Sequence, residues 1–227
     1  MKWNLKIKNS AEKAEIWVYG NVVDNMQGTF LQSFGVDGVV FPKQIQEQLD
    51  EIGDKPVNVY IASDGGDVNA GFAIASMLQR LKGKTTAYID SWAASIASVI
   101  ALVCDAVIMP ANTFLMIHNP LCGVVGNASD LRKTADLLDT MRDSIVTVYK
   151  THDKAETDFI KLMDEETWLT AEQASEIWDH VTLTGETNKA VACVSNFASA
   201  PEAVKRARVS KYADLVKQAT EVLQNDK

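Results

Sequence analysis

Strand-like and helix-like segments alternate from residue 57 to residue 117, and this alternation restricts the fold more than any other feature of the chain. The first strand, VNVYIA, runs into a glycine-containing turn, SDGGD, which opens a helix that we expect to end near Gly83. Strands that alternate with helices in this way are typical of βαβ units, so we expect an α/β fold with a mostly parallel sheet. The expected strands are 57–62, 84–89, 106–109 and 114–117, and the expected helices are 67–83 and 91–104.

Further elements are expected on both sides of this region. Residues 21–40 contain scattered glycines and are interpreted as a long loop, with or without a short helical piece. Within that loop, Phe30 and Phe34 either line a substrate groove or pack on the core. The other expected elements are a strand at 15–20 and helices at 42–53, 128–149, 154–163 and 170–178, the last with a Thr170–Gln173 capping box. We expect one domain over residues 1–190, then a linker and a C-terminal helix over residues 191–227.

Composition excludes several classes of function. A chain of 227 residues with 47% apolar content can bury one sizeable core. The net charge of −8 argues against a nucleic-acid surface, which needs clustered Lys and Arg. The longest uncharged run, 91–104, is too short to cross a bilayer, and no secretory signal is recognised at the N-terminus. Three cysteines without a CxxC pair favour a reducing compartment, so we expect a cytoplasmic protein without a membrane partner.

Ser95 is the candidate nucleophile, because it lies between paired alanines and an apolar helix. Free backbone N–H groups at a helix start favour negative charge, so the Ile96 amide can stabilise an oxyanion. Gly65 and Gly66 open another helix and allow the backbone to approach a ligand closely. Taken singly, these features also fit a small residue packed in a helix interface and a plain turn between a strand and a helix.

The chain has three histidines, which narrows the choice of a general base. His118 follows the apolar strand FLMI, and side chains at strand ends commonly face a site; a histidine that is merely hydrogen-bonded there is the alternative. His152 and His180 lie in polar sequence and are expected to be exposed. No Cys or Glu stands at metal-ligand spacing from them, so we expect no metal site and no cofactor. Cys122 is a rival nucleophile near His118, but it lacks a glycine turn or a helix start beside it.

Four segments occur in an order and at separations that resemble the Clp protease proteolytic subunit family (ClpP). They are YIASDGGDVNAGFAIASML, SWAASIAS, FLMIHNP and ETWLTAEQA, and the resemblance covers residues 16–181. It is strongest to the Clp-related head maturation proteases of tailed phages and prophages. The resemblance therefore implies a ClpP/crotonase-like α/β fold of repeated ββα/βαβ units, with a long helix for oligomer contacts.

The resemblance also implies roles for individual residues. Ser95 takes the place of the family nucleophile and His118 that of the general base, while the amides of Gly66 and Ile96 form the oxyanion hole. The chain departs from the family motifs with Ile96 for Met, Asn119 for Gln and Asp64 for Pro.

The third member of the implied triad is an acid. Laying the segment WLTA on the family's Phe-Leu-Ser-Ala type segment places Glu166 at the aspartate position, and Asp164 is the alternative if the local loop differs. Either acid also fits an exposed position on a polar turn.

Taken together, the resemblance implies a serine endopeptidase that assembles as a homo-oligomeric ring. Its substrates would be proteins or peptides, in particular phage capsid or scaffold proteins processed in the bacterial host cytoplasm or inside a phage prohead. The helix at 128–149 is the candidate for ring stacking. No GxxxxGK[ST] loop is present, so any ATP use would belong to a partner ATPase. A crotonase-like acyl-CoA enzyme and a non-catalytic scaffold or shell subunit with the same fold are the alternatives.

Overall fold

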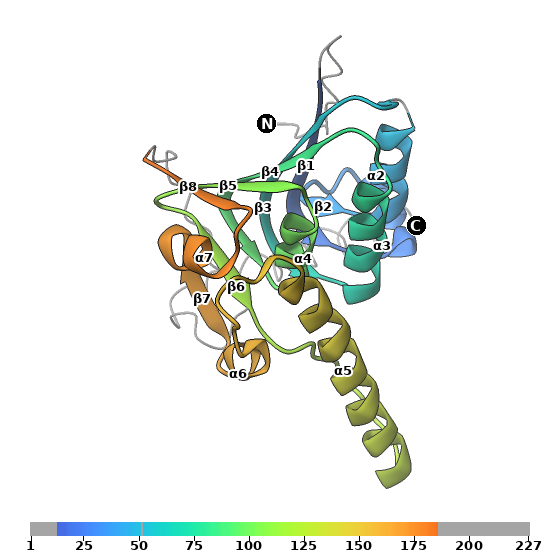
Figure 1. Cartoon of the computed structure of the whole chain (residues 1–227). Helices are drawn as coiled ribbons and strands as arrows, with labels where there is room; N and C mark the ends of the chain where they lie inside the picture. The colour runs from blue at the N-terminus through green and yellow to red at the C-terminus, as the bar shows by residue number, and fades with distance from the viewer. Residues whose placement is uncertain (1–12, 51, 186–227) are drawn as a thin grey trace. The chain divides into compact units, whose positions relative to one another are not determined.

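The computed structural model describes residues 13–50 and 52–185, and Figure 1 shows how their helices and strands are arranged. Eight strands form one sheet in the order β2-β1-β3-β4-β5-β8, while β6 pairs with β4 and β7 pairs with β6. All of these pairs are parallel except β6–β7. The expected α/β fold with a mostly parallel sheet is confirmed. The linker and helix expected in residues 191–227 lie outside the described residues.

The bounds of the elements are as follows. The strands are β1 (Ala14–Val22), β2 (Val39–Val40), β3 (Val57–Gly66), β4 (Thr85–Ala94), β5 (Ala106–Pro110), β6 (Phe114–Ile117), β7 (Thr167–Thr170) and β8 (Val181–Thr184). The helices are α1 (Asn25–Ser33), α2 (Pro42–Leu49), α3 (Val68–Gln79), α4 (Ile96–Leu102), α5 (Ala128–Tyr149), the 3-10 helix η1 (Lys150–His152), α6 (Phe159–Asp164) and α7 (Ala171–Ile177).

The helices α2, α3 and α4 pack in sequence against one another, and α4 also contacts strands of the sheet. Every residue of α4 is buried, because this short apolar helix lies between α3, the sheet and the C-terminal end of α5. Alternate residues of β3 and β4 are buried and belong to the same hydrophobic core. Ser95, which is partly buried, lies where β4 passes into α4, between the buried residues Ala94 and Ile96.

Several sequence predictions hold and others need correction. The long helix and the Thr170–Gln173 capping box are confirmed, whereas α6 begins only at Phe159. The helix expected from residue 91 begins at Ile96, since the preceding residues continue β4. The alternative that Phe30 and Phe34 pack on the core is wrong. Their side chains are 61% and 62% exposed and contact each other at the end of α1.

The strand β6 determines how three parts of the chain meet. It pairs in parallel with β4, placing Ala94 beside Met116, and in antiparallel with β7, placing Ile117 beside Thr167. One short strand thus holds the end of β4 on one side and the beginning of β7 on the other.

None of the helices in the described ranges is both long enough and apolar enough to span a membrane.

The end of β3 lies in close contact with the start of α4. Gly65 has a φ of +84°, and a Cβ built there would lie 2.6 Å from the Ala94 carbonyl oxygen and 2.7 Å from the Ser95 Cβ. The positive φ and the contact both require glycine, so the sequence SDGGD brings its backbone directly against Ser95.

Replacing Gly65 with alanine is expected to lower the free energy of unfolding by about 2–5 kcal/mol, because steric overlap adds to backbone strain. Gly38→Ala is the matched control, since Gly38 has the same φ of +84° with no atom within 4 Å of an added Cβ. It should cost only about 1–2 kcal/mol. Chemical denaturation at one fixed protein concentration measures both values, and equal costs would contradict the close contact at Gly65.

Candidate active site

Ser95 and His118 are brought together by the pairing of β4 with β6. Ser95 follows β4 and His118 follows β6, and the Ser95 N–H donates to the Met116 carbonyl oxygen at 2.9 Å. The Ser95 Oγ lies 2.8 Å from His118 Nε2, which is hydrogen-bond distance. With the ring proton on Nδ1, His118 Nε2 accepts the hydroxyl proton. The two residues singled out by the sequence therefore form a serine–histidine pair.

The backbone at Ser95 is strained. Its φ is 55° and its ψ is −130°, in a region that residues with a Cβ rarely adopt. Among the described residues, only Ser95, Glu156 and Glu166 combine a side chain with a positive φ. Strain of this kind costs about 1–3 kcal/mol per residue and concentrates at functional sites. Two of the three strained residues are candidates already selected from the sequence.

The strand pairing also distinguishes Glu166 from Asp164. Ile117 is paired with Thr167, so His118 and Glu166 lie next to each other just beyond the paired ends of β6 and β7. Asp164 instead ends α6, and its Oδ1 accepts a hydrogen bond of 2.7 Å from Asn119 Nδ2. Glu166 is therefore the acid placed to interact with His118.

The electrostatics of His118 agree with this placement. Burial lowers the pKa of His118, because desolvation disfavours the imidazolium, while the negative charge of Glu166 acts in the opposite direction. A lowered pKa keeps the imidazole neutral near pH 7, which is the form that can accept a proton from Ser95.

The glycine turn brings backbone rather than side chains to Ser95. A Cβ added to Gly65 would lie 3.0 Å from the Ile96 nitrogen, whereas one added to Gly66 would meet the Val22 carbonyl oxygen at 2.1 Å. Gly65 thus faces the start of α4, and Gly66 packs on β1. The carboxylate of Asp64 accepts a hydrogen bond of 2.8 Å from Trp92 Nε1.

A hydrogen-bonded link not predicted from the sequence connects Ser95 to α5. Ser98 Oγ donates to the Ser95 carbonyl oxygen at 2.6 Å and lies 2.8 Å from the Tyr149 hydroxyl oxygen. Tyr149 is buried, and it is the last residue of α5. Because Ser98 is part of an apolar run, its polar role is not apparent from its sequence context.

The other two histidines do not join this site through any contact in the described structure. His152 hydrogen-bonds with Asp179 at 2.9 Å, and its side chain is 40% exposed. His180 is not exposed as expected, since only 6% of its side chain is accessible. Cys122, the rival nucleophile, is exposed and free.

Comparisons with known proteins agree on one family. The sequence model described as Clp protease matches residues 43–181, more than half of the chain. The chain is 33% identical over 129 residues to an ATP-dependent Clp protease proteolytic subunit of Bacteroides thetaiotaomicron, covering 54% of this chain and 57% of that protein. It is 31% identical over 136 residues to the protein of the same name from Bdellovibrio bacteriovorus, covering 56% and 64%. The chain thus matches less than two thirds of the length of these relatives.

Removing the Glu166 charge is expected to lower the pKa of His118. In the unmodified chain the pKa should lie below the ordinary value of 6.5, and Glu166→Gln should lower it further because the charge favouring imidazolium is lost. Histidine-ring NMR titration measures the midpoint, with the His118 signal assigned by its loss in His118→Ala. Asp164→Asn is the matched control and should leave the midpoint unchanged; a shift caused by Asp164→Asn instead of Glu166→Gln would contradict this arrangement.

Proposed function

Since the chain belongs to the Clp protease family, we propose that it is a serine endopeptidase in which Ser95 is the nucleophile and His118 the general base. The α/β architecture with its mostly parallel sheet is consistent with the ClpP fold. The observation that supports the proposal most strongly is the 2.8 Å contact between Ser95 Oγ and His118 Nε2.

In the proposed reaction, His118 Nε2 takes the hydroxyl proton as Ser95 Oγ attacks the carbonyl carbon of a peptide bond. The resulting imidazolium then donates that proton to the nitrogen of the leaving amine, and the peptide C–N bond breaks. Water, deprotonated by His118, hydrolyses the acyl-serine ester and regenerates both side chains. A serine hydroxyl is a weak nucleophile alone, so the neutral imidazole is required at the start of the cycle.

Glu166 is proposed to orient and stabilise the His118 imidazolium. Its position beside His118 across the β6–β7 pair, and its effect on the His118 pKa, support this role over that of Asp164. The amides of Gly66 and Ile96 are proposed to stabilise the oxyanion, Ile96 because it begins α4 directly after Ser95.

A fluorophosphonate is expected to form one adduct, on Ser95, detectable by peptide mass spectrometry. His118→Ala should reduce the labelling rate by roughly 10⁴-fold or more, because the hydroxyl then has no base. Cys122→Ser is the control for the exposed thiol and should label like the unmodified chain.

The same assay can refute the proposal and rank the two acids. Absence of an adduct on an intact oligomer would favour a non-catalytic scaffold subunit. Labelling that does not depend on His118 would leave a crotonase-like acyl-CoA enzyme as the alternative. Glu166→Gln should slow labelling far more than Asp164→Asn, because losing the orienting acid costs on the order of 10⁴-fold in related triads.

We further propose that the chain assembles as a ring and that α5 contributes to the contact between rings. Its buried residues, Ile145, Val146 and Tyr149, all lie near its C-terminal end, whereas Leu131 and Leu137 are 46% and 57% exposed. Figure 1 shows α5 extending away from the sheet. Sedimentation of the full chain as a monomer would contradict this part of the proposal.

The proposed substrates are phage capsid or scaffold proteins during head maturation, in the bacterial cytoplasm or within the prohead. The resemblance of the four quoted motifs to phage head maturation proteases supports this assignment. The relatives compared above are named as ATP-dependent, but no nucleotide-binding loop of the GxxxxGK[ST] type occurs in this sequence.

Incubation with a phage capsid precursor is expected to yield discrete fragments without an added ATPase, and Ser95→Ala should yield none. Gel electrophoresis with mass spectrometry of the fragments measures the outcome. If fragments form only when a Clp-type ATPase and ATP are supplied, and an unfolded protein such as casein is degraded equally well, the head-maturation assignment is wrong.

A further inference from the structure

A second cluster of titratable side chains lies where η1 meets the residues that precede β8. The Asp179 Oδ1 lies 2.9 Å from His152 Nδ1 and 3.9 Å from His180 Nδ1. One nitrogen or oxygen from each of the three residues lies within 4.8 Å of the others. None of these residues belongs to the proposed serine–histidine–glutamate site.

The His180 imidazole is buried with one nitrogen unpartnered. Its side chain is only 6% exposed, and its Nδ1 has no hydrogen-bond partner among the described residues. Its Nε2 donates to the Leu102 carbonyl oxygen at 3.2 Å, so the proton is on Nε2 and the lone pair of Nδ1 faces the cluster. A histidine that binds a metal usually donates its other ring N–H to a carbonyl or carboxylate in this way.

Backbone hydrogen bonds hold the three residues in place. An isolated bridge pairs Asp153 with Trp178, and the Asp179 N–H donates to the His152 carbonyl oxygen at 3.0 Å. On the other side, the Val107 N–H donates to the His180 carbonyl oxygen at 2.9 Å. The cluster is therefore preorganised by its backbone rather than assembled from mobile surface side chains.

We propose that His152, Asp179 and His180 form a binding site for a divalent transition-metal ion, with Zn²⁺ as the best match. Imidazole nitrogens and a carboxylate oxygen are ligands that Zn²⁺ accepts, at about 2.0–2.2 Å each. Ligand atoms around a tetrahedral ion are then about 3.3 Å apart, and the observed 2.9 Å and 3.9 Å lie on either side of that value. Binding displaces the proton that His152 Nδ1 shares with Asp179, and three protein ligands leave a fourth position for water.

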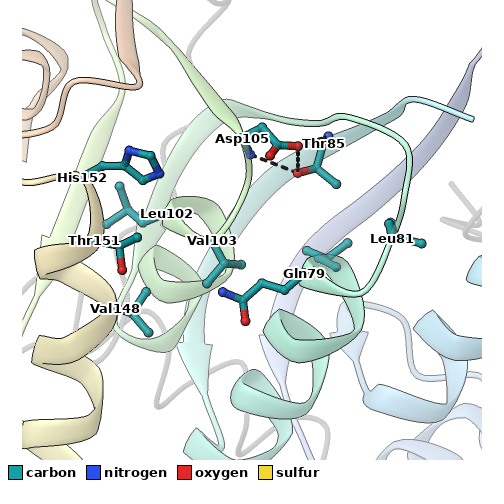
Figure 2. Close-up of a pocket in the computed structure, with 10 residues that line it drawn as sticks. Gln79, Leu81, Thr85, Leu102, Val103, Asp105, Val148, Thr151 and His152 are labelled. Atoms are coloured by element: carbon teal, nitrogen blue, oxygen red, sulfur yellow. Dashed lines mark hydrogen bonds between the residues drawn. The ribbon is translucent and has the colours of Figure 1, made fainter.

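The surroundings support binding of a cation. Burial and the neighbouring His152 both lower the pKa of His180, which favours the neutral imidazole that ligates metal. The side chains of His152 and Asp179 are 40% and 60% exposed, so an ion can enter from solvent. The cavity drawn in Figure 2 adjoins the cluster, since His152 and Leu102 both line it, and its volume is about 270 Å³.

Such an ion would join two segments that are distant in the sequence. His152 ends η1, which continues from α5, and His180 directly precedes β8 at the edge of the sheet. A bound ion would therefore connect the C-terminal end of α5, through η1, to the edge of the sheet. The sequence alone predicted no metal site, because two helices and a strand (α6, β7 and α7) separate His152 from Asp179 and His180.

Isothermal titration of the EDTA-treated full chain with ZnCl₂, in a buffer with a non-thiol reductant, tests the site. We expect one Zn²⁺ per chain at micromolar affinity and a rise in the thermal unfolding midpoint of several degrees. Asp179→Asn and His152→Ala, both at partly exposed positions, should each weaken binding at least tenfold and abolish the thermal shift. Absorption spectra of the Co²⁺ form provide a second readout of tetrahedral ligation.

Matched controls separate this site from other zinc ligands in the chain. Glu176→Gln removes an exposed carboxylate three residues before Asp179 and should leave affinity unchanged, as should Cys122→Ser. His118→Ala tests the serine–histidine site and should also retain the ion. The proposal is overturned if the unmodified chain binds no Zn²⁺, or if Asp179→Asn and His152→Ala bind it as tightly as the unmodified chain.

Discussion

The backbone hydrogen bonds of β6 are the interaction on which the candidate active site depends. This four-residue strand pairs with β4 on one side and β7 on the other, and each pairing delivers one residue to the site. Ser95, His118 and Glu166 all lie one position beyond a paired strand end. Because side chains alternate between the faces of a sheet, a shift of one residue in either register would turn a side chain away from the other two. The buried α4 and the close approach of Gly65 hold the end of β4 in this register.

Much of this arrangement follows from local sequence patterns. The long helix begins and ends at the predicted residues. Apolar residues recur at helical spacing along it, from the N-terminal cap at Asn127 to the last residue, Tyr149. Ser95 and His118 are identified by their positions, at a helix start and at a strand end, and by the resemblance of the quoted motifs to the ClpP family. Laying the WLTA segment on the family motif favours Glu166 and leaves Asp164 as the alternative, since two positions of difference in a short loop reverse the choice. The Ile117–Thr167 pairing and the Asn119–Asp164 hydrogen bond distinguish them, and both join residues far apart in the chain.

The errors at residues 91–94 and at His180 have a common physical origin in long-range packing. Residues 91–94 have an apolar, alanine-rich composition that suits a helix, but pairing with β6 keeps them extended. His180 lies in polar sequence, yet the β5–β8 pairing and the packing of His152 bury its ring. The cluster around Asp179 was not predicted for the same reason, because it depends on the bridge between Asp153 and Trp178. Local composition describes what a segment prefers alone, and tertiary contacts override that preference.

The conformation of Ser95 places function and stability in opposition. A φ of 55° is one that glycine adopts without penalty, so serine is not the residue that would make this turn most stable. The chain nevertheless carries a hydroxyl at that point, and the rest of the fold must offset the strain. Seven buried residues of α4, the Gly65 contact and the Ser98–Tyr149 link all surround the turn. The dense packing around Ser95 therefore offsets the backbone strain that a residue with a side chain incurs in this conformation. That packing allows the serine hydroxyl to be retained at this position, although glycine would be the more stable residue there.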